Sequence, residues 1–355
     1  MDFLSLIRYF ELRSKVLTFG KSQINLDFHS LIRTFVPSME IIYLNGQPRQ
    51  LLPCVATIGF FDGVHLGHRY LINKVVEMAR REKLAATVIT FAHHPRQVLQ
   101  PDWHPQLLST FDEKVALLSQ TDIDQLVILH FDREMANLSA HDFMRHVLLN
   151  RLNVKILFTG YDNRFGHREP GSTEGFNDYV QYGGEMGINV LQGAPIMAAD
   201  VRVSSSKIRR FLQEGQIRLA NQCLGRPYDL KGKVVGGEHI GSSLGFPTAN
   251  LQLTDEDKQI PAPGVYAVHV HIENSSELKL GMMNIGSRPT FGGNHQTLET
   301  HIFHFSGNLY GQTMTIKFVS RLRSEIKFDS REALIDQLEE DARQVEEILN
   351  QATGI

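Results

Sequence analysis

Residues 55–68 read VATIGFFDGVHLGH, and this stretch decides the fold of the first half of the chain. Its first part, Val55–Phe60, is an apolar, β-branched run that predicts a buried strand. The run leads into a glycine-rich turn, and a helical pattern with apolar residues at Leu71, Val75 and Ala79 follows. A strand, a glycine turn and a helix in this order predict one unit of a parallel α/β sheet.

More apolar runs alternate with helical patterns farther along the chain. Met39 opens the run MEIIY, which indicates a first strand. The other expected strands are Leu84–Phe91, Leu126–Phe131, Val154–Thr159 and Ile188–Gln192. Because helical segments separate these runs, the sheet should be parallel with both faces covered, and ligands should bind at the carboxyl ends of its strands.

The texture of the sequence changes after LGRPY at positions 224–228. Runs of β-branched and aromatic residues are now separated by glycine turns, which predicts a mostly antiparallel barrel or sandwich. The expected strands are Gly232–Val235, Val265–Ile272, Leu278–Ile285, Leu298–Phe305 and Thr313–Phe318. We therefore expect two domains, a Rossmann-like α/β domain over residues 39–224 and a β-rich domain over residues 225–355.

A helix closes the chain. Ser330 can cap it, and an apolar stripe runs from Leu334 to Leu349 along one face. The acidic residues at 339–341 and 346–347 are expected to form its solvated face.

The first 38 residues fit two interpretations. They lack the continuous apolar core of a secretory signal. The segment is either a short amphipathic helix that packs on the body, or upstream sequence added because translation starts at Met39 rather than at Met1.

Composition limits the class of protein. A chain of 355 residues is more than twice the ~150 residues of an average domain, and its net charge of −3 and hydrophobic fraction of 42% suit a globular protein. These values exclude a disordered chain and a polybasic nucleic-acid binder, and no apolar run approaches the ~18 residues that span a bilayer. Cys54 and Cys223 are too few for a disulfide framework, so a reducing cytoplasm is the simplest location.

The turn at residues 59–68 carries the first candidate site. Gly63 and Gly67 let the backbone approach a ligand, and the following helix offers free N–H groups. His65 and His68, three residues apart, share one face of a helical turn, where they can hold nucleotide phosphates and stabilise charge at an α-phosphate under attack. The alternative is that these histidines are surface residues or metal ligands.

The run SSSKIR at 204–209 is a second candidate. Ser204, Ser205 and Ser206 precede a helix, and Lys207 and Arg209 follow them. Hydroxyls at a helix start can simply cap it, but together with the basic side chains they can also clamp phosphate.

The β-rich half carries a third candidate, GSSLGFPTAN at 241–250. Gly241 and Gly245 suit a loop over phosphate, while Thr248 and Asn250 supply neutral oxygens of the kind that Mg²⁺ accepts. A plain structural turn is the alternative. Glu299 lies in an apolar strand pattern, either as a general base or as a barrel-rim acid paired with a neighbouring base.

Together these elements resemble the nucleotidylyltransferase superfamily, in which an HxGH turn and a hydroxyl-rich, basic helix start bracket ATP. The segments TFAHHP at 90–95, GYDNRFG at 160–166, SSSKIR, LGRPY and PTAN follow in order. Their order is similar to that of the bacterial bifunctional riboflavin kinases/FMN adenylyltransferases, over about residues 39–350. The chain departs from that pattern at three positions. His93 replaces a proline, Ser206 a threonine, and Ser242 a common arginine.

The resemblance implies a role for each candidate. His65 and His68 would contact the ATP phosphates, opposite Ser205 and Arg209. The ATP-binding set would further contain Gly59, Phe60, Asp62, Gly63, Gly67, Ser204, Ser206, Gly241, Gly245, Pro247 and Thr248. Flavin would be bound by Asn163, Arg164, Phe165, Asn284, Arg288, Arg323 and Phe328. Thr248 and Asn250 would hold Mg²⁺, and Glu299 would be the catalytic base.

The expected function is therefore an enzyme with two ATP-dependent sites. The β-rich domain would convert riboflavin to FMN, and the α/β domain would convert FMN to FAD. Two alternatives are an adenylyltransferase whose barrel only binds flavin, and a non-enzymatic flavin or nucleotide sensor. The expected partners are ATP, riboflavin and FMN, without nucleic acid or membrane, in a monomer or weak homo-oligomer.

Overall fold

The computed structural model describes residues 39–44, 51–161, 163–167, 171, 173–237, 240–273, 275–290 and 293–352. It leaves the side chains of residues 240, 242, 287–290, 293–295 and 352 undescribed. Both interpretations of residues 1–38, and the side chain of Arg288, therefore lie outside the described residues. Met39–Ile355 form one compact unit.

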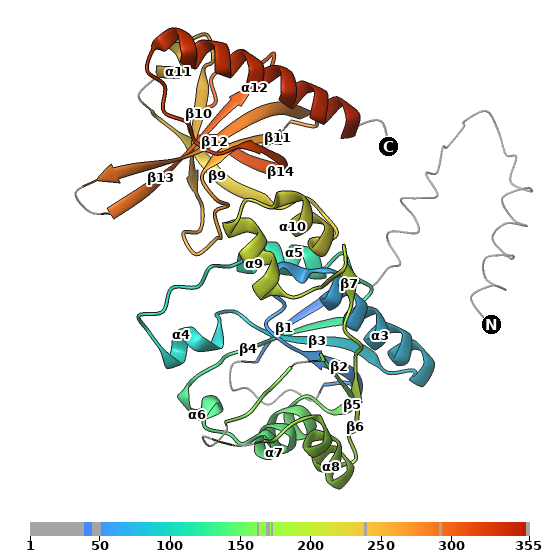
Figure 1. Ribbon diagram of the computed structural model, residues 1–355. Coiled ribbons are helices and arrows are strands. Elements are labelled where there is room, and N and C mark those ends of the chain that lie inside the picture. The colour runs from blue at the N-terminus through green and yellow to red at the C-terminus, as the bar shows by residue number, and fades with distance from the viewer. Residues whose placement is uncertain are drawn as a thin grey trace, which may run out of the picture. The chain divides into compact units, whose positions relative to one another are not determined.

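Six parallel strands form the sheet of the first domain (Figure 1). Its spatial order is β1-β4-β3-β2-β5-β6, and every neighbouring pair is parallel. The strands are β1 (Glu40–Leu44), β2 (Cys54–Ile58), β3 (Ala85–Phe91), β4 (Gln125–Leu129), β5 (Val154–Thr159) and β6 (Asn189–Gln192). The predicted strands and their parallel arrangement are thus confirmed, with ends that differ by one or two residues.

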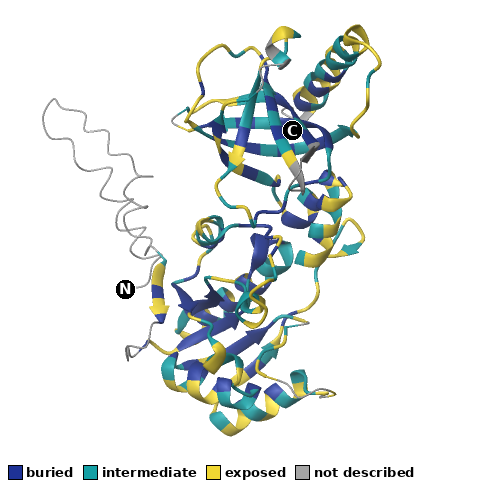
Figure 2. Cartoon of the chain, turned by 90° about the vertical axis from the view of Figure 1, so that its left-hand side faces the viewer, coloured by how far each residue is buried: buried dark blue, intermediate teal, exposed yellow. Residues whose placement is uncertain are grey.

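Both faces of this sheet are covered, which explains its continuous apolar runs. On β2, Val55 and Ala56 point to opposite faces, and each packs into a different apolar cluster. One face packs against α3 (Leu66–Glu82) and α5 (Phe111–Leu118). The other packs against α7 (Ala140–Phe143), a π-helical segment η2 (Met144–Arg151) and α8 (Phe176–Met186). Figure 2 shows the central strands β2 to β5 as mostly buried, whereas β1 carries exposed residues.

Shorter elements connect these layers. The turn after β2 contains a 3₁₀ helix η1 (Asp62–Val64). Beyond β3 and β4 lie α4 (Pro95–Leu99) and α6 (Arg133–Ala136). After β6, the hairpin β7 (Met197–Ala198) and β8 (Val201–Arg202) leads into α9 (Ser205–Gln213) and α10 (Ile217–Leu224).

The second domain is a closed antiparallel barrel in the order β10-β13-β12-β11-β14-β9. Its strands are β9 (Asp229–Val235), β10 (Thr248–Leu253), β11 (Gly264–Ile272), β12 (Leu278–Thr290), β13 (Gly293–Ile302) and β14 (Thr313–Arg323). The short helix α11 (Ile240–Ser243) lies between β9 and β10. The choice between barrel and sandwich is thereby settled. Strand β10 was not predicted, because its first residues belong to a glycine- and proline-containing stretch that is typical of a loop.

The final helix α12 (Arg331–Ala352) is confirmed, and so is its cap. The Ser330 hydroxyl accepts a hydrogen bond from the backbone N–H of Ala333 at 3.1 Å. Val345 and Leu349 are fully buried against barrel residues such as Met282. Asp341 corrects the expectation of a purely solvated acidic face, because it is 1% exposed and accepts hydrogen bonds from Arg323.

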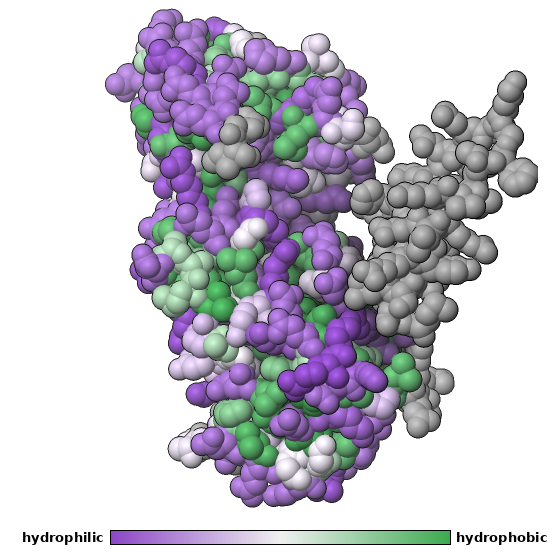
Figure 3. Space-filling model, turned by 90° about the vertical axis from the view of Figure 1, so that its right-hand side faces the viewer, coloured by the Kyte–Doolittle hydropathy of each residue, from purple (hydrophilic) through white to green (hydrophobic). Residues whose placement is uncertain are grey.

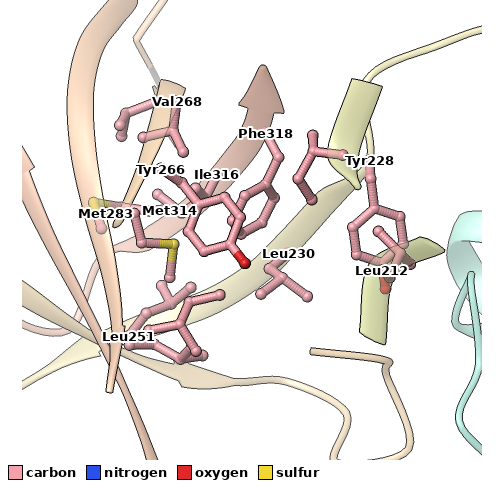
Figure 4. Packing of buried hydrophobic residues seen from close by; sticks show 14 of the residues in the cluster. Leu212, Tyr228, Leu230, Leu251, Tyr266, Val268, Met283, Met314, Ile316 and Phe318 are labelled. Carbon is pink, nitrogen blue, oxygen red and sulfur yellow. The ribbon is translucent and has the colours of Figure 1, made fainter. Parts of the chain in front are cut away.

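Helices α9 and α10 pack directly on the barrel. Leu212, Ile217 and Leu224 belong to the same buried cluster as the barrel residues Tyr266 and Phe318. Figure 4 shows part of this cluster, with Leu212 and Tyr228 close to each other. The residues on either side of the expected domain boundary at 224/225 therefore share one core.

Candidate active sites

The VATIGFFDGVHLGH turn lies at the topological switch point of the sheet. Strand β2 connects to β3 on one side, whereas its other neighbour, β5, connects to β6 in the opposite direction, so a crevice lies between the carboxyl ends of β2 and β5. A cavity of about 480 Å³ opens there. Its lining includes most of the predicted residues of this domain, namely Gly59, Phe60, Asp62, His65, Gly67, His68, Asn163, Arg164, Ser204, Ser205, Ser206 and Arg209. We call it the switch-point cavity.

The two histidines lie face to face at the start of α3. Their rings stack with centroids 3.6 Å apart, and Nδ1 of His65 accepts a hydrogen bond from the backbone N–H of His68. Burial lowers the pKa of His65 to about 4 and the pKa of His68 well below its usual value. Both imidazoles are therefore neutral near pH 7 in the ligand-free protein, and they offer phosphate N–H donors rather than fixed charges.

Glycine is required within the turn. Gly63 has φ +77°, and a Cβ there would lie 2.9 Å from Cβ of Leu108. Gly63 itself does not line the cavity; it lets the turn pack tightly beneath it. A Cβ at Gly67 would lie 3.2 Å from the ring of His65, so this glycine leaves room for the stacked histidines.

Asp62 is buried and binds protein groups. Its Oδ1 accepts hydrogen bonds from the backbone N–H groups of Leu108 and Ser109 at 2.9 and 3.1 Å. Its Oδ2 accepts one from Nη2 of Arg209 at 2.6 Å, while Nε of Arg209 donates to the Gln106 carbonyl. Asp62 thus fixes the guanidinium of Arg209 at the rim of the cavity.

The serines of SSSKIR have different contacts. Ser204 caps α9, since its hydroxyl accepts a hydrogen bond from the N–H of Lys207 at 3.4 Å. The Ser205 hydroxyl donates to the Asp62 carbonyl at 3.1 Å. The capping interpretation therefore holds for Ser204, and the structure brings both predicted motifs of this domain to one cavity.

The three predicted residues in the loop after β5 have different environments. Nδ2 of Asn163 donates to the Ile58 carbonyl at 2.5 Å, which ties the loop to the end of β2. Arg164 is exposed and lines the cavity. Phe165 instead stacks on Tyr179, with ring centroids 4.3 Å apart, and packs against the core.

Sequence reasoning missed Lys114, on α5. This side chain is 2% exposed, and its ammonium donates to the carbonyls of Phe60 and Phe91 at 3.2 and 2.7 Å. Burial lowers its pKa to about 8. No motif surrounds this lysine in the sequence, so only the fold reveals that it lies beneath the turn. His94 and Arg202, which also line the cavity, were missed as well.

The barrel brings three predicted residues into one row. In the strand register, Glu299 on β13 lies opposite Asn250 of β10 on one side and Asn284 of β12 on the other. Paired residues on neighbouring antiparallel strands project to the same face. Thr248 shares that face with Asn250, because the two are two residues apart on β10. All three of Glu299, Asn250 and Asn284 are half-buried.

The loop before β10 is tightly turned. The Gly241 carbonyl accepts hydrogen bonds from the N–H groups of Leu244 and Phe246 at 3.0 and 2.9 Å. A Cβ at Gly241 would lie 2.3 Å from the Phe246 carbonyl oxygen, and Gly245 has φ +85°. The Pro247 carbonyl lies 2.8 Å from Nδ1 of His301, so the loop is fixed to β13 immediately before Thr248.

Arg323 and Phe328 lie together, with the guanidinium 5.9 Å from the ring centroid. Arg323 also forms an ion pair with buried Asp341, with 2.6 Å between Nη2 and Oδ2. This contact connects the end of β14 to α12.

The fold and these sites define a class of protein. It joins an α/β domain with an HxGH turn at its switch point to a closed barrel with a PTAN strand. The model of the FAD synthetase family matches residues 47–207, and the model of the riboflavin kinase family matches residues 224–349.

Relatives with both domains are similar along nearly their whole length. The bifunctional riboflavin kinase/FMN adenylyltransferase of Haemophilus influenzae is 35% identical over 308 residues, which cover 86% of this chain and 98% of that protein. The protein of the same name from Bacillus subtilis is 34% identical, over 82% of this chain and 90% of its own. The chain belongs to the family of bifunctional riboflavin kinases/FMN adenylyltransferases, and it has the domains of both activities.

A solved structure confirms the fold. The crystal structure of a protein from Streptococcus pneumoniae, named macrolide-efflux protein, matches with a TM-score of 0.78 at 30% identity, over 87% of this chain and 99% of that one. Within the described residues, no helix combines the length and apolar character needed to cross a bilayer. The surface in Figure 3 shows hydrophilic residues interspersed with smaller hydrophobic patches.

Proposed function

We propose that the two reactions of this family take place at the two sites described above. FMN is adenylylated with ATP at the switch-point cavity, and riboflavin is phosphorylated with ATP at the Glu299 row of the barrel. The observation that carries the proposal is that each set of candidate residues converges. The HxGH turn and SSSKIR line one cavity, while Glu299 lies between Asn250 and Asn284.

Adenylyl transfer needs positioning and electrostatics more than covalent chemistry. The phosphate of FMN is already a nucleophile, and it attacks the α-phosphate of ATP in line as pyrophosphate leaves. The amino end of α3 and the N–H donors of His65 and His68 would stabilise charge at the α-phosphate. Ser205 and Arg209 would clamp the triphosphate from the opposite side, with Arg209 held in place by Asp62.

The protonation of the two histidines depends on whether the nucleotide is bound, and neutral rings suit the site before it binds. A bound triphosphate places negative charge beside both rings and raises their pKa values. The two histidines therefore take up protons more readily only when the nucleotide is bound.

Riboflavin phosphorylation needs a base beside the attacking hydroxyl. Glu299 would accept the proton of the ribityl hydroxyl as the hydroxyl oxygen attacks the γ-phosphate of ATP and ADP leaves. The loop Gly241–Pro247 would cover the phosphates. Asn284 lies on the same face for the flavin side, and we keep Arg288, Arg323 and Phe328 as flavin-binding candidates.

The residues beside Glu299 fit a magnesium ion. Thr248 and Asn250 offer a hydroxyl and an amide oxygen on one face of β10, with the Glu299 carboxylate next to them. Mg²⁺ favours such hard oxygens and shares its remaining positions with water and phosphates. When bound, the ion would neutralise phosphate charge.

Single-site variants test the two-site assignment. We expect His68→Ala to stop FAD formation while FMN still accumulates from riboflavin and ATP. Glu299→Ala should block FMN formation yet still convert supplied FMN to FAD. Chromatography that resolves the three flavins measures both. Matched controls are His146→Ala and Glu273→Ala, which remove exposed side chains from the same two domains.

Three results would contradict the assignment. Loss of both activities in a folded single variant would mean that the sites are not separate. If Glu299→Ala left FMN formation intact, the kinase reaction would use another base. If the barrel only bound flavin, the parent protein would make no FMN from riboflavin.

We propose the remaining properties alongside this assignment. We place the adenylyl reaction in residues 39–224 and the kinase reaction in residues 225–355, in a cytoplasmic enzyme that is a monomer or weak homo-oligomer. Cys54 and Cys223 are both buried free thiols, as a reducing compartment permits.

A further inference from the structure

A three-residue strap, Leu107–Ser109, connects the adenylyl turn to the barrel domain. On one side, Asp62 accepts the N–H groups of Leu108 and Ser109, and the Ser109 hydroxyl accepts the N–H of Gly63 at 2.9 Å. These three bonds hold the turn that carries His65 and orients Arg209.

The other side of the strap is bonded to the barrel. The N–H of Leu107 donates to the Asp257 carbonyl at 2.7 Å, and the N–H of Gln259 donates to the Leu107 carbonyl at 2.8 Å. Residues 257–259 lie between β10 and β11, so this segment of the second domain pairs with the strap like a short strand.

Lys258 extends the same contact into α5. Its ammonium donates to the carboxylate of Glu113 and lies 3.7 Å from Asp229. Glu113 also closes the capping box of α5, because its Oε2 accepts the N–H of Thr110 at 3.0 Å, and Thr110 follows the strap directly. Lys258 is 4% exposed. Neither proposed reaction uses this buried cation.

The neighbouring residue on α5 points to the turn. Lys114 donates to the carbonyls of Phe60 and Phe91, and its ammonium lies 4.0 Å from the Phe60 ring centroid. Consecutive residues of one helix, Glu113 and Lys114, are thus bonded to the barrel and to the adenylyl turn respectively.

We propose that Lys258, a residue of the kinase domain, is a positioning residue for adenylyl transfer. Its ion pair with Glu113 fixes the first turn of α5, and through the strap and Lys114 it fixes the turn that holds the reacting phosphates. A buried ion pair is weak evidence for net stability, so the role we assign to this pair is geometric. A misplacement of about 1 Å in such a site costs on the order of a hundredfold in rate. The inference rests on the adenylyl site proposed above.

The test compares Lys258→Met with the parent in the full-length protein. We expect kcat for FAD formation from FMN and ATP to fall about tenfold or more. KM for ATP should change less than kcat, because the residue touches no substrate, and riboflavin phosphorylation should stay within about twofold. Lys231→Met, which removes an exposed lysine of the same barrel, should change neither activity.

A variant on the other side of the pair distinguishes positioning from damage to the barrel. Glu113→Gln keeps an oxygen for the Thr110 cap but removes the charge, so it should reproduce the loss of FAD formation. The double variant should be no slower than the slower single one, because both break the same link.

Three results would overturn the proposal: full FAD formation in Lys258→Met, full FAD formation in Glu113→Gln, or losses that multiply in the double variant. If Lys258→Met lost both activities, Glu113→Gln would decide. Failure of the adenylyl assignment itself is separately visible, because His68→Ala would then still make FAD.

Discussion

At the scale of single residues, burial governs the chemistry of the adenylyl turn. His65 is 5% exposed, and its pKa of about 4 lies well below the usual value near 6.5. Between these two values the unfolded chain binds a proton that the folded chain excludes. The stability that results is complete above pH 6.5 and is lost as pH falls through 4.

His65→Gln should therefore weaken the acid sensitivity of the fold. A shift of this size corresponds to about 3 kcal/mol between pH 7 and pH 4. We expect the free energy of unfolding of the parent to fall by up to about that much more than that of the variant over this range. Urea titrations at several pH values measure it. Equal pH slopes in both proteins would show that His65 is not buried in its neutral form.

The turn also depends on a backbone that only glycine adopts easily. Gly63→Ala places a Cβ at positive φ and 2.9 Å from Leu108. We expect a loss of stability of at least about 1–2 kcal/mol and slower FAD formation, with riboflavin phosphorylation retained. Thermal melting and the flavin assay measure both. Gly184→Ala is the control, since its Cβ meets nothing and the helix should gain up to about 1 kcal/mol. An equal effect of the two substitutions would contradict the argument.

Site residues could be predicted from the sequence where a motif of chemically suitable residues followed the end of a predicted strand. The positions of His65, His68, Ser205 and Arg209 around one cavity followed from the sequence. The orientation of individual side chains did not. Phe165 packs into the core, and Lys114 reaches the turn from a helix 46 residues beyond His68, so neither position could be predicted from local pattern.

At the scale of elements, alternation and apolar runs predicted most strands. Strand β10 was missed because PTAN opens with proline and polar residues, which are typical of loops. Its pairing with β9 and β13 closes the barrel and overrides that local preference. The same pairing places Asn250 beside Glu299. The polar residues that made this strand resemble a loop are therefore the ones that belong to the proposed site.

In helix α12, Asp341 is a second case in which the fold differs from what the local sequence indicates. Asp341 belongs to an acidic run, yet it is buried and paired with Arg323, which is itself 18% exposed. Asp341→Asn removes this charge and should cost about 3 kcal/mol of stability, because Arg323 then lacks its partner. Glu339→Gln, an exposed neighbour in the same run, should change stability by less than about 0.5 kcal/mol. Denaturant unfolding compares them. Similar losses of stability in the two variants would mean that water solvates the Arg323 guanidinium once Asp341 is replaced.

At the scale of the whole molecule, sequence texture located the change of architecture but not the way in which the core is shared. The break after LGRPY is real, since the parallel sheet lies before it and the barrel after it. Sequence cannot tell which side a linking helix packs on, because an amphipathic stripe does not identify its partner. Here α9 and α10 belong to the barrel's core, although SSSKIR at the start of α9 serves the adenylyl cavity.

This sharing predicts the stability of the isolated kinase domain. A fragment of residues 205–355 keeps α10, where Asn221 donates to the Phe318 carbonyl and accepts the N–H of Tyr228 at 2.9 and 2.7 Å. A fragment of residues 225–355 loses those bonds, worth about 1 kcal/mol each, and exposes the apolar surface that Ile217 and Leu224 cover. Its melting temperature should therefore be lower by at least about 5 °C. Circular dichroism melting compares the two fragments. Asn221→Ala in the longer fragment should lower its melting temperature by part of this difference. Equal melting temperatures would mean that α10 belongs to the first domain alone, and that the barrel is a self-sufficient unit.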